Sequence, residues 1–528
     1  MPDESSAHVT LSCSVLCSAA GQISGWEATK PMKMTDPNVT GQQTEKRKTA
    51  GREFAAMTGA ALLAIALWGG NALAQTTPPP QPAPQAPSAE QKTIQAKAPT
   101  AQPERKISKA EADELFRSVD QILQFVSKDT GLPIKHPVKR KLASREEVVK
   151  YLEDNMKGDE DTKRMESSAV TLEKLGLLPQ GFALRDFLLK LLKEQVAGYY
   201  DTKTKTVYLL NWVEPEAQKP VLAHELTHAL QDQNFNLKKW SEVTSAKHLS
   251  DQQTIDRDEQ RAARQAVVEG QAMVTLLDYY LAPEGRSVAD SPAIVKAIQA
   301  GMMTGGSSPM FAKAPMFLQE SLVFPYMEGV DFEGSVLRKL GKQGAFAGVF
   351  KTPPEDTRQI MQPETYLAHE VVPQMKFVNL DKVVGKPYKR YDFGGLGEFD
   401  IYLLVRQWVD IRTANEVSKG WRGGYYLTYR KKDDKPGEAE MALVTKWPDR
   451  AAAEQFASIY AASLKKRYKQ VRRLDDGSGF KSSKWMTEQG EVDIDVVGKL
   501  LVVTEGFDDA LAAKLKQAMV DGDEAPAN

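Results

Sequence analysis

The most informative ten residues of the chain are VLAHELTHAL, at positions 221–230, which contain a His-Glu-x-x-His motif at His224, Glu225 and His228. Residues four apart on an α-helix lie on the same face, so both histidines can direct their imidazoles at one metal ion. Glu225 is rotated about 100° from His224, which turns its carboxylate toward the attacking water rather than toward the metal. Two neutral nitrogen donors beside a carboxylate base are what hydrolysis at a zinc centre requires.

The motif predicts a helix from Pro220 to Gln233, because Pro220 fits a first helical turn and the apolar residues cover the opposite side. A zinc site that performs chemistry keeps one position open, so one more protein ligand is needed. The structural alternative at this point is a helix with two histidines that only pack.

Glu269 is the best candidate for the third ligand, because it lies in an apolar part of a long predicted helix, Gln253 to Leu281. Burying an unpaired carboxylate costs several kcal/mol, and a metal ion removes that cost. Gly270 beside it would let this helix approach another backbone closely. Three apolar residues share the face of Glu269, namely Ala266, Ala272 and Met273.

Other interpretations of this region stay open. Glu269 could form an ion pair with Arg264 instead of binding metal. His248, in a predicted loop, is a weaker rival as third ligand. One of the acids that follow His248 in the sequence is a further alternative as third ligand: Asp251, Asp256 or Asp258.

The elements before the motif predict helices with a small β edge. Helices are expected at 108–129, from Ser144 with Glu147 as a capping box, and over Leu184–Gln195. Residues 138–142 could form a short strand. Two β-rich runs, 196–200 and 206–210, predict a hairpin.

After about residue 376 the pattern changes to that of a separate α+β domain. Helices are expected over 398–418, 449–466 and 508–519, with strands over 425–429, 441–447, 492–496 and 500–504. Alternation of Val492, Ile494 and Val496 with Asp493 and Asp495 predicts a sheet with one solvent-facing side. Residues 292–375 are expected to be mostly helical.

The first hundred residues indicate export. A cationic cluster at 46–52 precedes an apolar run over 54–68 and the sequence Ala72-Leu73-Ala74, the order of a secretory signal peptide, with cleavage expected after Ala74. About 15 apolar residues are fewer than the roughly 20 that a spanning helix needs.

The predicted organisation is a signal-containing extension over 1–74, a Pro-rich linker over 75–104, a catalytic domain over 105–375 and a C-terminal domain over 376–528. The mature protein is expected in the periplasm or outside the cell, with no stable membrane span.

Composition excludes several classes. The 528 residues carry a formal charge of −1 and are 41% hydrophobic, so neither a nucleic-acid-binding field nor a multi-span membrane protein is indicated. Both cysteines, Cys13 and Cys17, precede the apolar run. A metal in the folded part must therefore be held by histidines and carboxylates.

The motif and the later Glu269-Gly270 resemble the gluzincin metallopeptidases, the thermolysin-like zincins. A longer string resembles a poorly characterised set of exported bacterial proteins of that type over roughly residues 105–370. It consists of Gly198-Tyr199-Tyr200-Asp201, His224 to Gln233, Val268-Glu269-Gly270 and Phe324-Pro325-Tyr326. The resemblance implies an α+β, zincin-like fold whose mainly helical catalytic domain has a small antiparallel β edge. It also implies that His224, His228 and Glu269 bind Zn²⁺ and that Glu225 is the general base.

Two departures from the gluzincin pattern matter. Forty residues separate His228 from Glu269, and position 273 is Met where many gluzincins have an Asp that orients a ligand histidine. That orienting role must pass to another residue, with Asp232 and Gln231 as candidates.

The predicted function is an exported zinc metallopeptidase that hydrolyses peptide or protein substrates. The hairpin before the motif could pair with extended substrate or could be scaffold only. Tyr326, or less favourably His369 or Arg358, could stabilise the oxyanion. The alternative function is an envelope binding or assembly factor on a zincin scaffold, with a structural or lost metal.

Overall fold

The computed structural model describes residues 106–524 apart from 156–158, 196–197, 242–248, 291–292, 294–295, 297–308, 372–374, 432–437 and 476–481. The predicted signal peptide, the Pro-rich linker and His248 lie outside the described residues. Within the described part of the chain, no helix is both long and apolar enough to cross a membrane.

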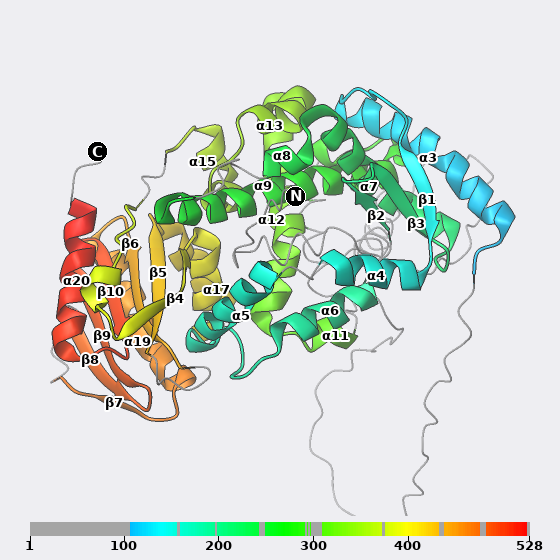
Figure 1. The fold of residues 1–528 in the computed structure, drawn as a ribbon. Coiled ribbons are helices and arrows are strands. Elements are labelled where there is room, and N and C mark those ends of the chain that lie inside the picture. The colour runs from blue at the N-terminus through cyan, green and yellow to red at the C-terminus, as the bar shows by residue number, and fades with distance from the viewer. Residues whose placement is uncertain are drawn as a thin grey trace, which may run out of the picture.

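The chain is α+β, as predicted, with a mainly helical region over residues 109–384 and a C-terminal seven-stranded antiparallel sheet with helices. Figure 1 shows the two regions side by side, with the helical region on the right and the sheet on the left. Buried side chains of one continuous apolar core extend from helices near the N-terminus to strands near the C-terminus. The proposed domain boundary between residues 375 and 376 stays a prediction.

Helices dominate the first region, and most lie close to their predicted positions. Their bounds are α3 Lys109–Thr130, α4 Arg145–Asn155, α5 Asp159–Lys174, α6 Leu184–Gln195, α7 Pro215–Phe235, α8 Leu237–Ser241, α9 Asp251–Leu281, α11 Pro309–Ala312, α12 Met316–Lys342, α13 Val349–Lys351, α14 Thr357–Met361, α15 Pro363–Leu367 and α16 Asp381–Val384. A π-helical turn, Gln343–Gly348, connects α12 to α13.

Local hydrogen bonds determine where α4 starts and α3 ends, close to the positions predicted from the sequence. The predicted capping box of α4 is present, because the Ser144 amide donates to Glu147 and the Glu147 amide donates to the Ser144 hydroxyl. Gly131 ends α3 in the left-handed conformation, at φ 75°.

The small sheet differs from the prediction in one strand. Strands β2 (Tyr199–Asp201) and β3 (Thr206–Leu210) form the predicted antiparallel hairpin. Strand β1 (Lys139–Ala143) pairs with β3 in parallel, so the strand order is β1-β3-β2 and the expected antiparallel edge is a mixed sheet. A parallel pair needs a long crossover, and helices α4 to α6 supply it between β1 and the hairpin.

The C-terminal sheet has the strand order β4-β5-β6-β10-β9-β8-β7, with every neighbouring pair antiparallel. Its elements are β4 Tyr388–Gly395, α17 Glu398–Trp408, α18 Ile411–Val417, β5 Gly424–Lys431, β6 Glu440–Lys446, α19 Arg450–Arg467, β7 Val471–Arg473, β8 Ser482–Thr487, β9 Gly490–Val497, β10 Leu500–Glu505 and α20 Asp509–Glu524.

Two expectations for this sheet were wrong. The predicted helix over 398–418 is two helices, because Asp410 caps α18 by accepting a hydrogen bond from the Thr413 amide at 2.8 Å. The central strands β6 and β10 are buried on both faces rather than on one. Helix α19 packs on one face of these strands and α20 on the other.

Helices α9 and α12 cross at a contact between Gly270 and Gly329. A Cβ atom added to Gly270 would lie 2.3 Å from the Gly329 carbonyl oxygen, and one added to Gly329 would lie 2.3 Å from the Ala266 carbonyl oxygen. The close approach predicted for Gly270 is therefore confirmed. It fixes the distance between the two helices one residue away from Glu269.

We expect Gly329→Ala to lower the free energy of unfolding by about 1–3 kcal/mol, because backbone rather than a flexible side chain occupies the space of the new methyl group. Denaturant melts measure the effect. Gly348→Ala is the matched control, since its φ is −62° and its nearest contact is an ordinary 3.5 Å. Equal stability of Gly329→Ala and Gly348→Ala would contradict the assignment of this crossing.

Candidate metal centre

Helix α7 supplies both histidines from one face. His224 and His228 are 5% and 6% exposed, and Leu222, Leu226 and Leu230 are buried in the apolar core. The helix starts at Pro215, so the expectation that Pro220 lies in the first turn was wrong. Pro220 is inside the helix, where it cannot donate to the carbonyl four residues before it.

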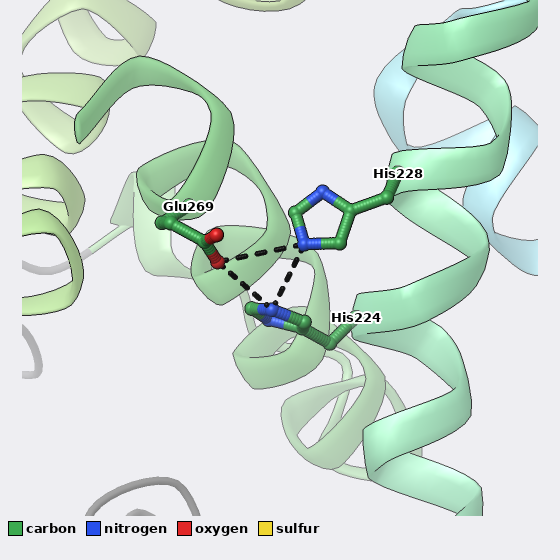
Figure 2. Close-up of side chains that lie close together, drawn as sticks. All are labelled: His224, His228 and Glu269. Carbon is green, nitrogen blue, oxygen red and sulfur yellow. Dashed lines mark hydrogen bonds and ion pairs between the residues drawn. The ribbon is translucent and has the colours of Figure 1, made fainter. Parts of the chain in front are cut away.

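Glu269 on α9 completes a triangle of three possible ligand atoms (Figure 2). The His224 and His228 Nε2 atoms are 3.1 Å apart, and the Glu269 Oε2 atom lies 3.2 Å from the first and 3.4 Å from the second. All three residues are buried. Among the residues that the structure describes, this is the one group of three or more such side chains close enough to hold a metal ion.

The shape of the triangle fits a tetrahedral metal. Three ligand atoms at about 2.0–2.1 Å from a tetrahedral zinc ion lie about 3.3 Å from one another. The observed separations of 3.1–3.4 Å match that spacing. The buried Glu269 Oε2 atom accepts no hydrogen bond, so it is available as a ligand.

The other carboxylate oxygen of Glu269 is already bonded. The Gln265 side chain donates to Glu269 Oε1 at 2.7 Å, which leaves Oε2 facing the histidines. The alternative ion pair with Arg264 is not formed, because that guanidinium donates to the Trp240 carbonyl and stacks over the Trp240 ring.

Charge is concentrated in this buried group. Burial raises the pKa of the Glu269 carboxyl, but His228 and His224 outweigh it and lower this pKa to about 2. Burial lowers the pKa of His228, but Glu269 and Glu225 together raise it to about 9. A metal ion would therefore compete with a proton for the His228 ring.

Glu225 lies next to the triangle and is held by the hairpin. Its Oε2 atom accepts a hydrogen bond of 2.8 Å from the Tyr200 backbone amide on β2. Burial raises the pKa of Glu225, opposed by His224 and His228. A buried carboxylate of raised pKa beside two histidines has the properties of a general base.

Gln231 takes the orienting role that the sequence left open between two residues. Its Oε1 atom lies 2.9 Å from His228 Nδ1. Asp232 instead accepts hydrogen bonds from the Tyr200 hydroxyl and the Lys205 amine, which anchor α7 to the hairpin. It also accepts one from the Leu237 amide at the start of α8.

The three oxyanion candidates differ in where the structure places them. The Tyr326 ring lies beside His224, with ring centroids 6.2 Å apart and an angle of 25°. Arg358 is committed elsewhere, because it bonds to Glu398, Glu370 and the Lys419 carbonyl. His369 is exposed at the end of α15, with φ 54°.

The rival third ligands receive no support. His248 lies outside the described residues. Asp251 pairs with Arg390 at 2.8 Å and Asp256 accepts from Gln252 at 2.9 Å, both near the start of α9. Neither these two acids nor Asp258 belongs to the described metal-ligating group.

Sequence reasoning missed four contributors to this site. Two are the Tyr200 amide and Gln265, described above. The other two are Gln271, which accepts a hydrogen bond from Gln231, and Glu333, which accepts one from Gln271. Gln265 could have been found, because it precedes Glu269 by four residues and so shares its helix face. Gln271 lies in an apolar part of its helix, the same signal that identified Glu269, whereas Glu333 stands between Phe332 and Gly334 and gives no such signal. The Tyr200 amide carries no side-chain signal.

Comparison with known proteins assigns no function to the chain. Residues 386–514, which contain most of the C-terminal sheet region, match a family described as a domain of unknown function, DUF8575. No curated protein and no solved structure is significantly similar to the chain. The matched family covers less than half of the chain and does not include the metal-ligating group.

Proposed function

We propose that the protein is a zinc-dependent metallopeptidase of the gluzincin type, with His224, His228 and Glu269 as zinc ligands. The observation that carries this proposal is the buried triangle of ligand atoms with the spacing of a tetrahedral site. Glu225, one residue beyond a ligand, supports hydrolysis rather than a purely structural metal.

In the proposed hydrolysis, the metal and two side chains would have separate roles. Zinc, when bound, supplies Lewis acidity that lowers the pKa of a water and polarises a carbonyl. Glu225 accepts a proton from the water that attacks the peptide carbonyl, and its hydrogen bond from the Tyr200 amide holds the carboxylate in place. Tyr326, beside His224, is the candidate donor to the oxyanion.

The hairpin supports this mechanism as a positioning element. The outward-facing amide of Tyr200 on edge strand β2 is bonded to Glu225. That donor is therefore not free to pair with an extended substrate, so the observation favours a scaffold role for this part of the hairpin.

The alternative function is a binding or assembly factor that keeps the zincin scaffold without catalysis. The two functions differ in what metal removal does. A peptidase loses hydrolysis when the metal is removed and regains it when zinc is returned, whereas a binding factor shows no hydrolysis in either state.

The test uses the full mature chain and a library of quenched-fluorescent peptides. We expect about one zinc per chain in wild type and none in His224→Ala or His228→Ala, with hydrolysis abolished by a chelator and restored by Zn²⁺. His136→Ala is the control, because His136 is exposed and distant in sequence from the motif. Hydrolysis that persists in metal-free protein would contradict the zinc assignment, and zinc-loaded wild type without hydrolysis would favour the binding factor.

We also propose export, from the basic and apolar runs that precede Ala74. Mass spectrometry of the mature protein is expected to show an N-terminus at Gln75. Residue 60 present in the bulk of the purified protein would contradict the proposal.

A further inference from the structure

A chain of buried side chains continues from His228 away from the triangle. Gln231 Oε1 lies 2.9 Å from His228 Nδ1, and Gln231 Nε2 donates to Gln271 Oε1 at 3.0 Å. Gln271 Nε2 in turn lies 3.3 Å from Glu333 Oε1. Gln231 and Gln271 are fully buried and Glu333 is 1% exposed, so these hydrogen bonds are shielded from bulk solvent.

Two backbone carbonyls fix the direction of this chain. Gln231 Nε2 also donates to the Val268 carbonyl at 3.1 Å, and Gln271 Nε2 donates to the Ala345 carbonyl at 2.8 Å. A carbonyl oxygen can only accept, so each Nε2 must face its carbonyl and each Oε1 must face back toward His228. The atom at His228 Nδ1 must therefore be a donor. In the neutral ring that binds a metal, Nε2 then carries the free lone pair, on the side that faces Glu269.

The chain ends on the helix that also contacts the other histidine. Tyr326, Gly329 and Glu333 follow one another on α12 at spacings of three and four residues, so they share one face. Tyr326 lies beside His224, Gly329 contacts Gly270, and Glu333 receives the hydrogen bond from Gln271. One face of α12 therefore contacts His224 directly and is connected to His228 through Gln271 and Gln231.

We infer that Gln231, Gln271 and Glu333 are positioning residues that hold His228 in the Nδ1–H form and thereby set the metal affinity of the site. This inference rests on the metal site of the proposed function. It differs from the arrangement in which an Asp orients the histidine, because the group next to His228 is a neutral amide. The amides orient the ring without adding a negative charge beside the metal.

Zinc affinity, measured by competition with a chromophoric chelator, tests the inference without reference to activity. Loss of the orienting partner of a ligand histidine typically weakens metal binding about 10–100-fold, and we expect that loss for Gln231→Leu. Smaller losses are expected for Gln271→Leu and then Glu333→Leu, in the order of their distance from His228. Glu333→Gln retains an acceptor for Gln271 and is expected to recover most of the affinity that Glu333→Leu loses.

Gln218→Leu is the matched control for a general loss of packing. Gln218 is a buried glutamine on the same helix whose side chain bonds to the backbone of Leu210 and Val213 and not to the ligands. The Gln218→Leu variant is expected to have a lower melting temperature and the zinc affinity of wild type.

A second measurement follows the Nδ1 proton of His228 in zinc-loaded protein with ¹⁵N-labelled histidine. This proton is expected to exchange slowly in wild type and in Glu333→Gln, and faster in Gln271→Leu.

Wild-type zinc affinity in both Gln231→Leu and Gln271→Leu would overturn this inference and leave the proposed function intact. Equal loss of affinity in Glu333→Leu and Glu333→Gln would also overturn it, because the acceptor would then have no role. A wild-type protein that takes up no zinc would contradict the proposed function and this inference together.

Discussion

Glu225→Gln is expected to lower peptide hydrolysis by about 10²–10⁴-fold, the usual effect of removing a general base. The amide retains the size of the carboxylate and its acceptor for the Tyr200 amide, so the fold and the zinc content are expected to stay unchanged. It cannot accept a proton from the attacking water. Steady-state hydrolysis and metal analysis of the same preparations measure both effects.

Two further variants define the role of Glu225. Glu225→Asp is expected to fail as well, because its carboxylate is one methylene shorter and does not reach the water. Glu216→Gln is the control, since Glu216 is an exposed acid on the same helix paired with Lys219, and its activity is expected to equal that of wild type. Wild-type hydrolysis by zinc-loaded Glu225→Gln protein would remove Glu225 from the mechanism.

Glu505→Gln is expected to destabilise the protein by about 3–5 kcal/mol, because the variant leaves two buried cations without their counter-charge. Glu505 is fully buried at the end of β10, where its carboxylate lies 2.6 Å from Arg467 and 3.5 Å from Lys174. The Tyr460 and Tyr468 hydroxyls also donate to it. Lys174 belongs to α5, so this ion group joins the helical region to the C-terminal sheet.

The same group predicts a loss of stability in acid. Burial raises the pKa of Glu505, but Arg467 and Lys174 outweigh it and lower this pKa to about 2. A carboxyl with a lowered pKa in the folded state contributes stability above its unfolded pKa of about 4.3, and that contribution decreases as the pH falls toward 2. Glu505→Gln is expected to lack this part of the acid dependence.

Denaturant melts at pH 7 and at lower pH measure both parts of this prediction. The control is Glu454→Gln, which removes an exposed ion pair with Arg450 on α19 and is expected to change stability by no more than about 0.5 kcal/mol. Equal melts for Glu505→Gln and Glu454→Gln would contradict a stabilising role for the buried group.

Local periodicity was enough to predict the centre of the site. The four-residue spacing of His224 and His228 is a local property of α7, and the apolar surroundings of Glu269 are a local property of α9. Gly270 indicated a close helix contact, and the structure confirms it. Sequence alone could not say that the partner would be α12, because that contact joins segments about sixty residues apart.

Two further features of the structure depend on contacts between distant parts of the chain. The parallel pairing of β1 with β3 depends on helices between them, and strand residues Lys139, Arg140 and Lys141 give no apolar pattern. The hydrogen-bonded chain from His228 to Glu333 connects three helices. The sequence offered Gln231 as one of two candidates to orient a ligand histidine, but no local pattern names Gln271 or Glu333 as the residues bonded beyond it.

The most direct test of the zinc site is a crystal structure of zinc-loaded wild-type protein with anomalous data above and below the zinc absorption edge. The proposed site predicts one strong peak present only above the edge, about 2.0–2.2 Å from His224 Nε2, His228 Nε2 and Glu269 Oε2. A protein that contains one zinc per chain with its anomalous peak elsewhere, or with none between these three atoms, would contradict the assignment.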